Sequence, residues 1–377
     1  MDDPPVVDDA VGATTSATSS SSTFLPPSVH QQPLLAGASF THFSPIPPAL
    51  LAPASTTTTT ATATPTSTST PTVTSPDGLT TTASGSGPPC ALGVDEAGRG
   101  PVLGPMVYGV FFLPLPLSDP LLRDAHHFDD SKVLTPAVRS DLMRALCTPG
   151  SDLHASCGWA TTALSARDIA AGMLRPAAVY NLNAQAMDAT VDLIKGVYAR
   201  GVNVQEIYVD TIGQPAAYQA KLQRVFPTAR ITVAKKADSL YPCVSAASVC
   251  AKVTRDAALE ELYRREARRD VRDGEDDADA DTAMAWGSGY PSDARCVGWM
   301  KSNMHPVFGW GPECRFSWGT AKDMLEAGKG NGVHVEWPLD DDGETSRLTD
   351  FFTAGPADKE ANELGTWFGA PAGLEAF

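Results

Sequence analysis

Four acidic residues in the middle of the chain stand at or just after strand-like apolar runs. They are Asp95 and Glu96 after residues 91–94, Asp210 at the end of residues 206–210, and Asp238 shortly after residues 230–234. Functional groups in an α/β sheet gather at the carboxyl ends of strands, so we expect these acids to converge. Clustered carboxylates raise one another's pKa unless cations balance them, and their hard oxygens favour Mg²⁺ or Mn²⁺. Two such ions about 4 Å apart can activate a water and stabilise the leaving oxygen of a phosphodiester, so the acids predict a two-metal hydrolytic site.

Asp95 and Glu96 are adjacent, which constrains the local backbone. Neighbouring residues on a regular strand point to opposite faces, so the two share a site only if the strand ends or bulges there. Gly98 and Gly100 favour such a departure. A surface or capping carboxylate remains the alternative for each acid taken alone.

Two further motifs are candidate contacts to a nucleic acid. Gly98 and Gly100 leave one cation, Arg99, between residues without side chains, so backbone amides and a guanidinium can approach a sugar-phosphate backbone. Tyr290 stands between Gly289 and Pro291, in a turn where its ring can stack on a base or sugar. A simple turn and ordinary packing are the alternatives. Candidate phosphate contacts, each with solvated charge as its alternative, are Lys132, Lys235, Lys236, Lys252 and Arg255.

Strand-like and helix-like segments alternate through the middle of the chain, which predicts an α/β domain. Expected strands are 91–94 paired with 106–113, then 154–164, 206–210 and 230–234. Expected helices are 134–146, 165–171, 180–198 and 242–263, followed by two helices at 292–303 and 318–325.

The ends of the chain differ from its middle in composition. Residues 1–88 are rich in Ser, Thr, Pro and Ala and contain no Lys or Arg, which predicts a disordered tail. Residues 264–285 change from Arg-rich to Asp-rich and are expected to be the tail of a helix running into a disordered acidic insertion. Residues 329–377 are expected to form an acidic, partly disordered segment with aromatic residues as candidate docking groups. The folded domain is therefore expected at 89–328.

Charge and cysteine content limit the class of protein. The formal net charge is −16, but residues 89–263 and 286–329 together hold 21 acids and 21 bases, so the acidic ends do not exclude a nucleic-acid substrate. The seven cysteines show no C-x-x-C spacing, and the chain shows neither a signal peptide nor a membrane-length apolar run. These features predict reduced thiols in an intracellular, soluble protein.

Several separated motifs, taken together, resemble the type 2 ribonucleases H, also called the ribonuclease HII family. The matching strings, in the family's order, are Gly93-Val94-Asp95-Glu96-Ala97-Gly98-Arg99-Gly100-Pro101, Asp130-Ser131-Lys132, Tyr208-Val209-Asp210-Thr211, Lys236-Ala237-Asp238, Ser245-Ala246-Ala247-Ser248 and Gly287-Ser288-Gly289-Tyr290-Pro291. The resemblance spans residues 93 to 325. The last of these strings and Arg315-Phe316-Ser317-Trp318 resemble the eukaryotic catalytic subunit more than the bacterial single-chain enzyme.

The resemblance implies a ribonuclease-H-like fold, with a mixed central sheet flanked by helices and a small helical C-terminal extension. It also implies an endonuclease that hydrolyses the RNA strand of RNA/DNA hybrids and cuts 5′ of single ribonucleotides in duplex DNA, leaving a 3′-hydroxyl and a 5′-phosphate. The implied roles are metal binding and catalysis for Asp95, Glu96, Asp210 and Asp238, and substrate binding for Gly98, Arg99, Gly100, Lys132 and Tyr290. Two Mg²⁺ or Mn²⁺ ions, two accessory subunits, no membrane, and a nuclear role in DNA replication and ribonucleotide excision repair are implied as well.

Two other interpretations remain open at this point. A resolvase or transposase of the same fold also uses clustered acids, but needs no reader of the ribose 2′-hydroxyl. A non-catalytic scaffold would keep the fold and bind hybrids or partners. Loss of an acid would favour the scaffold, and all four are present.

Overall fold

A computed structural model describes residues 24–51, 87–128, 134–175, 180–211, 213–272 and 284–326, with only the backbone for 267–272. The chain divides into two compact units, Met1–Gly332 and Val333–Phe377, and all described residues belong to the first. Among them no helix is both long enough and apolar enough to cross a bilayer.

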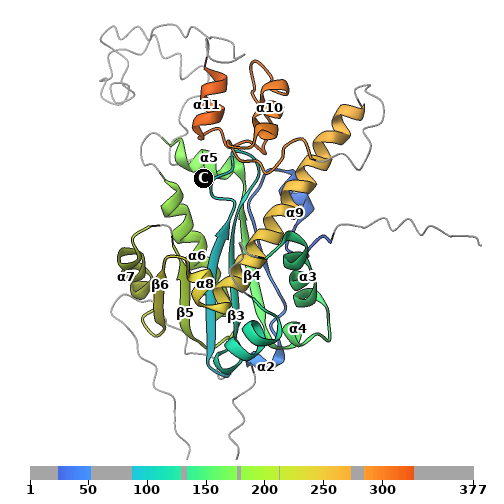
Figure 1. Cartoon of the computed structure of the whole chain (residues 1–377). Coiled ribbons are helices and arrows are strands. Elements are labelled where there is room, and N and C mark those ends of the chain that lie inside the picture. The colour runs from blue at the N-terminus through green and yellow to red at the C-terminus, as the bar shows by residue number, and fades with distance from the viewer. Residues whose placement is uncertain are drawn as a thin grey trace, which may run out of the picture. The chain divides into compact units, whose positions relative to one another are not determined.

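A six-stranded mixed sheet with the order β1-β4-β3-β2-β5-β6 lies at the centre of this unit (Figure 1). Each neighbouring pair from β1 to β2 is antiparallel, whereas β5 is parallel to β2 and β6 is parallel to β5. The strands are β1 (Phe40–Phe43), β2 (Cys90–Ala97), β3 (Met106–Pro114), β4 (Gly158–Leu164), β5 (Val204–Asp210) and β6 (Arg230–Ala234). The predicted α/β class and the predicted pairing of 91–94 with 106–113 are confirmed.

Helices cover both faces of the sheet. Successive side chains of β2 point to opposite faces and so enter two different cores. Leu92 and Val94 join the core beneath α5 (Ala166–Met173), α6 (Leu182–Ala199) and α7 (Pro215–Val225). Ala91 joins the core beneath α3 (Pro136–Cys147), α4 (Asp152–Ser156), α8 (Ala237–Leu240) and α9 (Pro242–Arg272). Gly93 lies so close to α9 that a Cβ there would be 2.3 Å from the Cys243 carbonyl, so only glycine fits. Figure 1 shows α9 crossing this face of the sheet.

Several helices begin at a side chain that caps their first turn. The side chains of Thr135, Ser165 and Asn181 accept backbone N–H groups at the starts of α3, α5 and α6. The predicted strand 154–164 is wrong in its first part, because Ser151 caps α4 and β4 begins only at Gly158. The sequence pattern also did not predict α7, α8, or the short 3₁₀ and π turns η1 (Leu115–Leu117) and η2 (Ser118–Ala125).

A small helical extension follows the sheet domain, as predicted. It contains α10 (Ala294–Ser302) and α11 (Gly319–Leu325), which share a core with the second half of α9. The predicted helix tail is confirmed over 264–272, which continue α9, whereas the predicted disordered insertion is wrong for 284–285, which adjoin the buried Trp286. Residues 273–283 and the predicted acidic segment 329–377 lie outside the described residues.

The prediction of a disordered tail over 1–88 is wrong for residues 24–51. This segment contains α1 (Gln31–Leu35), β1 and α2 (Pro48–Leu51), and β1 pairs with β4 from Phe40 opposite Ala163 to Phe43 opposite Ala160. Leu34 and Leu50 are buried in two different cores. Residues 24–51 are ordered by pairing with β4 and by packing into the cores, and not by their local propensity. The Ser/Thr-rich sequence on both sides of this segment made its few apolar residues hard to recognise as core positions.

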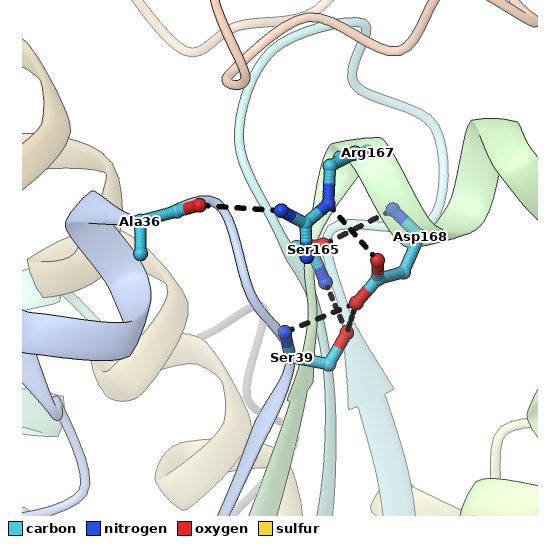
Figure 2. Close-up of polar contacts among 5 residues, drawn as sticks. All are labelled: Ala36, Ser39, Ser165, Arg167 and Asp168. Carbon is cyan, nitrogen blue, oxygen red and sulfur yellow. Dashed lines mark hydrogen bonds and ion pairs between the residues drawn. The ribbon is translucent and has the colours of Figure 1, made fainter.

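A cluster of side chains ties this N-terminal segment to α5 (Figure 2). The Ser39 hydroxyl donates to Asp168 Oδ2 at 2.6 Å and accepts the backbone N–H of Ser165 at 3.0 Å. Arg167 donates to Asp168 at 3.2 Å and to the Ala36 carbonyl at 3.3 Å. Although partial burial raises the pKa of Asp168, hydrogen bonds from Ser39 and Arg167 outweigh it and hold that pKa below its usual value.

We expect Asp168→Ala to lower the free energy of unfolding by about 1 kcal/mol, since three hydrogen bonds to the carboxylate are lost at a partly solvated site. The loss should shrink as pH falls through the depressed pKa of Asp168, where the wild-type carboxylate also becomes neutral. Urea unfolding at pH 7 and pH 3 measures both effects. Asp141→Ala, an exposed acid on α3, is the control. Equal stability of Asp168→Ala and wild type at pH 7 would show that the cluster does not hold the N-terminal segment.

Candidate active site

The four predicted acids line one pocket of about 720 Å³ at the end of β2 and β5. Val94 pairs with Val209, so the next residue on each of these parallel strands is an acid, Asp95 or Asp210. Asp210 Oδ1 accepts the backbone N–H of Ala237 at 2.9 Å, which fixes the start of α8 beside β5. Asp238 follows within α8 and is buried. It follows β6, as predicted, but stands in a helix and not at the strand end itself, because a turn through Lys236, with φ of 58°, separates it from β6.

Asp95 and Glu96 reach this pocket without the predicted end or bulge of their strand. The pairing of β2 with β3 continues in register through Asp95 opposite Gly109, Glu96 opposite Tyr108 and on to Ala97. Asp95 therefore faces α9, where Ser248 bonds to it, whereas Glu96 faces the side of α6 and α7. The pairing of β2 with β5 ends at Val94, so β2 has no neighbouring strand on that side at Asp95 and Glu96. Both carboxylates therefore line the same pocket although they point to opposite faces.

The electrostatic environment of these acids disfavours two adjacent negative charges. Burial raises the pKa of Asp95 to about 8, and the charges of Glu96 and Asp210 add to that shift against hydrogen bonds from Ser248 and the Glu96 amide. Burial, with a contribution from Asp210, raises the pKa of Glu96 to about 7, although Arg99 opposes the shift. A cation bound between them would relieve this repulsion.

The predicted substrate-binding residues Gly98, Arg99, Gly100 and Tyr290 come together beside the acids. A Cβ on Gly100 would lie 3.0 Å from the Tyr290 ring, so the loop and the aromatic turn are in direct contact. The Gly289 carbonyl accepts the backbone N–H of Val102 at 2.8 Å. Gly98 has φ of 75°, and a Cβ there would lie 2.8 Å from the Pro105 carbonyl, so this conformation requires glycine. Tyr290 is 39% exposed, which leaves ring surface open for a ligand.

A buried arginine behind this loop was not predicted as a functional residue. Arg315 is completely buried and donates to the carbonyls of Gly98, Arg99 and Gly104 at 2.7, 3.1 and 3.0 Å. Its guanidinium lies 4.8 Å from the ring of Trp318, whose Nε1 donates to the Gly100 carbonyl at 3.0 Å. Burial lowers the pKa of Arg315 to about 9, which leaves it charged at neutral pH. By turning these carbonyls inward, the helical extension leaves the opposite side of the loop to face the pocket.

The proposed phosphate contacts divide into three groups. Lys252 and Arg255 line the pocket, together with Arg139 of α3, which was not predicted. Arg255 is 6% exposed and bridges two motifs, since it donates to the Ser288 carbonyl at 2.7 Å and lies against Gly98. Lys235 and Lys236 are exposed and do not line the pocket. Lys132 lies outside the described residues.

The donor set fits a hard divalent cation. All four acids supply carboxylate oxygens, and among the described residues no His or Cys lines the same pocket. Across the ranges that the structure describes, no three His, Cys, Asp or Glu side chains are already gathered closely enough to form a complete metal site. Magnesium commonly takes only one or two protein carboxylates and completes its shell with water and substrate phosphates, so acids spread around a pocket suit it.

Comparison with known proteins agrees with this geometry. The profile of the family described as ribonuclease HII matches residues 92–321. The chain belongs to the ribonuclease HII family. It is 60% identical over 358 residues to a ribonuclease H2 subunit from Neurospora crassa, covering 94% of this chain and 97% of that protein. It is 45% identical over 239 residues to the human protein of the same name, covering 63% of this chain and 73% of that one.

A solved structure is also similar to this ribonuclease HII family member. The crystal structure of ribonuclease H2 from Pyrococcus horikoshii aligns with a TM-score of 0.48 and 28% identity, over 62% of this chain and 95% of that one. Membership of the ribonuclease HII family identifies the chain as a ribonuclease H, hence a hydrolytic nuclease with a ribonuclease-H-like fold. It also decides against the resolvase or transposase alternative.

Proposed function

We propose that the chain hydrolyses the RNA strand of RNA/DNA hybrids and cuts on the 5′ side of single ribonucleotides embedded in duplex DNA. The observation that supports this proposal is the shared pocket, in which the acids of β2, β5 and α8 meet the loop Gly98–Gly100 and Tyr290. A nuclease specific for RNA must detect the 2′-hydroxyl. A loop in which glycines stand on both sides of Arg99 would bring backbone amides within reach of that hydroxyl.

Asp95, Glu96, Asp210 and Asp238 would hold two divalent ions, Mg²⁺ or Mn²⁺. Such ions would supply an activated water and charge stabilisation of the leaving oxygen, which would give products with a 3′-hydroxyl and a 5′-phosphate. The loop Gly98–Gly100 reads the ribose, while the Tyr290 ring stacks on the adjoining nucleotide. Arg139, Lys252 and Arg255 at the pocket wall offset phosphate charge.

The relatives from Neurospora crassa, Schizosaccharomyces pombe and Homo sapiens all carry the name of the same ribonuclease H2 subunit. On this basis, we propose that the chain is the catalytic member of a heterotrimer with two accessory subunits. Its proposed place is the nucleus, where it would act in DNA replication and ribonucleotide excision repair.

The test is cleavage of three labelled duplexes in Mg²⁺: one with a single ribonucleotide, one with a continuous RNA strand, and an all-DNA control. We expect cutting of both ribonucleotide-containing duplexes at the RNA residues, none of the control, and complete loss in EDTA. The full chain is assayed alone and with candidate accessory subunits. Product ends are mapped by 3′-extension with a polymerase, which requires a 3′-hydroxyl.

Two results would contradict the proposal. Cutting of the all-DNA duplex would show that cleavage does not require the ribose 2′-hydroxyl. Absence of cleavage with the accessory subunits present would instead favour a scaffold that has kept the fold.

A further inference from the structure

A second pocket lies on the Glu96 side of the sheet, between the start of α6, the end of β5 and α7. We call it the α6–α7 pocket. It measures about 570 Å³, and its polar wall includes Asn181, Asn183, Thr211, Gln214, Tyr218 and Lys221. None of these residues belongs to the acid cluster or to the loop of the active site. The pocket is therefore a cavity that the proposed chemistry does not itself explain.

The α6–α7 pocket adjoins the active-site pocket. Glu96, Arg99 and Asp210 line both pockets. Arg99 Nη2 donates to Asn183 Oδ1 at 2.5 Å, which joins the loop Gly98–Gly100 to the start of α6. A polymer held across the acids would therefore continue from one pocket into the other.

The wall of the α6–α7 pocket has the chemistry of a sugar-phosphate contact surface. Asn183 and Gln214 carry amides that can both donate and accept, and Thr211 adds a hydroxyl. Most hydrogen bonds between proteins and nucleic acids reach phosphate and sugar oxygens through such side chains. Lys221 is exposed, so its ammonium can meet a phosphate from the solvent side.

Three acids also line the α6–α7 pocket, and each has another partner or role. Asp188 accepts a hydrogen bond from the Tyr180 hydroxyl. Glu96 and Asp210 are the proposed metal ligands, so bound cations would balance their charge. With Glu96 and Asp210 assigned to cations, the two bases Arg99 and Lys221 outnumber the one remaining acid, Asp188.

We propose that the α6–α7 pocket binds the backbone of the cleaved strand on one side of the scissile phosphate. In this arrangement Lys221 contacts a phosphate, and Asn183 and Gln214 contact neighbouring sugar or phosphate oxygens. This inference rests on the proposed function and adds a binding site to it.

The test combines a protein variant with single neutralised phosphates. A methylphosphonate is placed at one position at a time along the cleaved strand of a duplex with one ribonucleotide, avoiding the scissile position. The value of kcat/KM is measured for the full chain with its accessory subunits, as wild type and as Lys221→Ala. Lys195→Ala, an exposed lysine on α6 that does not line the pocket, is the matched control.

We expect one position, on one side of the cut, where neutralisation lowers kcat/KM about tenfold in the wild type and in Lys195→Ala. The same neutralisation should have less than about a twofold effect in Lys221→Ala, because the interacting charge is already gone. Lys221→Ala on the unmodified duplex should raise KM with little change in kcat, and reduce the slope of binding against salt by about one ion. The Asn183→Ala variant should also raise KM.

The inference is wrong if every neutralised position has equal effects in wild type and Lys221→Ala, although the wild type cuts the unmodified duplex at its ribonucleotide. Failure of the wild type to cut that duplex would instead overturn the proposed function, and the inference would fall with it.

Discussion

Replacing Asp95 by Asn is expected to reduce cleavage by about 10³-fold or more while raising the stability of the metal-free protein. The loss follows because an amide cannot supply the anionic oxygen of a metal ligand, and metal charge stabilisation is worth several kcal/mol in such sites. The stability of the metal-free protein should rise because the substitution removes a buried charge beside Glu96 and Asp210. Asn keeps an acceptor for the Glu96 N–H, which lies 2.8 Å from Asp95 Oδ1.

The pH dependence gives this prediction a definite sign. The pKa of Asp95 is about 8 in the folded chain and about 4 when unfolded, so between those values the folded state binds more protons. Its contribution to stability is therefore full below pH 4 and is lost as the pH rises towards 8. In Asp95→Asn the part of the loss of stability between pH 4 and pH 8 that is due to Asp95 should be absent.

Thermal unfolding in EDTA at pH 5 and pH 8, together with the cleavage assay, measures these effects. The midpoint of Asp95→Asn should exceed that of wild type at pH 8, by about 2–4 °C for each kcal/mol gained. Asp119→Asn, which replaces an exposed acid, is the control for loss of charge alone. A lower midpoint than wild type at pH 8 would mean that Asp95 stabilises the fold and would contradict the prediction.

The second large effect is expected at Arg315, which bonds to three carbonyls in and beside the Gly98–Gly100 loop. Each buried carbonyl left without a donor costs about 1–3 kcal/mol, so Arg315→Gln should lower the free energy of unfolding by about 3 kcal/mol or more. Arg315→Lys should recover only part of this loss, because a single ammonium cannot replace the planar fork of donors.

Arg315 should affect activity beyond its effect on stability, since its bonds orient the loop that reads the ribose. Cleavage is measured well below the unfolding midpoint of each variant. There we expect Arg315→Lys to lose rate on the single-ribonucleotide duplex although it is folded, while Arg144→Gln, which breaks an exposed ion pair on α3, keeps the wild-type rate. Wild-type cleavage by a folded Arg315→Lys would show that the arginine only stabilises the extension.

Much of the architecture was predictable because periodicity and caps mark it directly. The runs that became β2, β3, β5 and β6 are short and apolar, and Thr135 and Ser165 mark the starts of α3 and α5 by their capping chemistry. Segment 24–51 was not predictable in this way, because β1 is stabilised by pairing with β4 rather than by its own pattern. Helix α4 was missed because residues 154–164 were taken as one strand across the boundary at Gly158.

The acids of the site were predictable by residue type, but their geometry was not. The regular pairing of β2 with β3 through Ala97 depends on the partner strand, which the local sequence around Gly98 does not describe. Arg315 gave no signal beyond its place in a string resembling the family, since a buried arginine has the same letter as a solvated one. Only the packed structure shows that its donors meet the carbonyls of Gly98 and Arg99.

The position of β1 also constrains the order in which the chain assembles. Strand β1 comes first in the sequence but pairs only with β4, which follows both β2 and β3. On the ribosome, residues 40–43 must therefore wait while the β2–β3 hairpin forms from nearby residues and β4 is added to it. The N-terminal segment therefore joins the edge of the sheet at β4 only after β2, the strand bearing Asp95 and Glu96, has paired with β3.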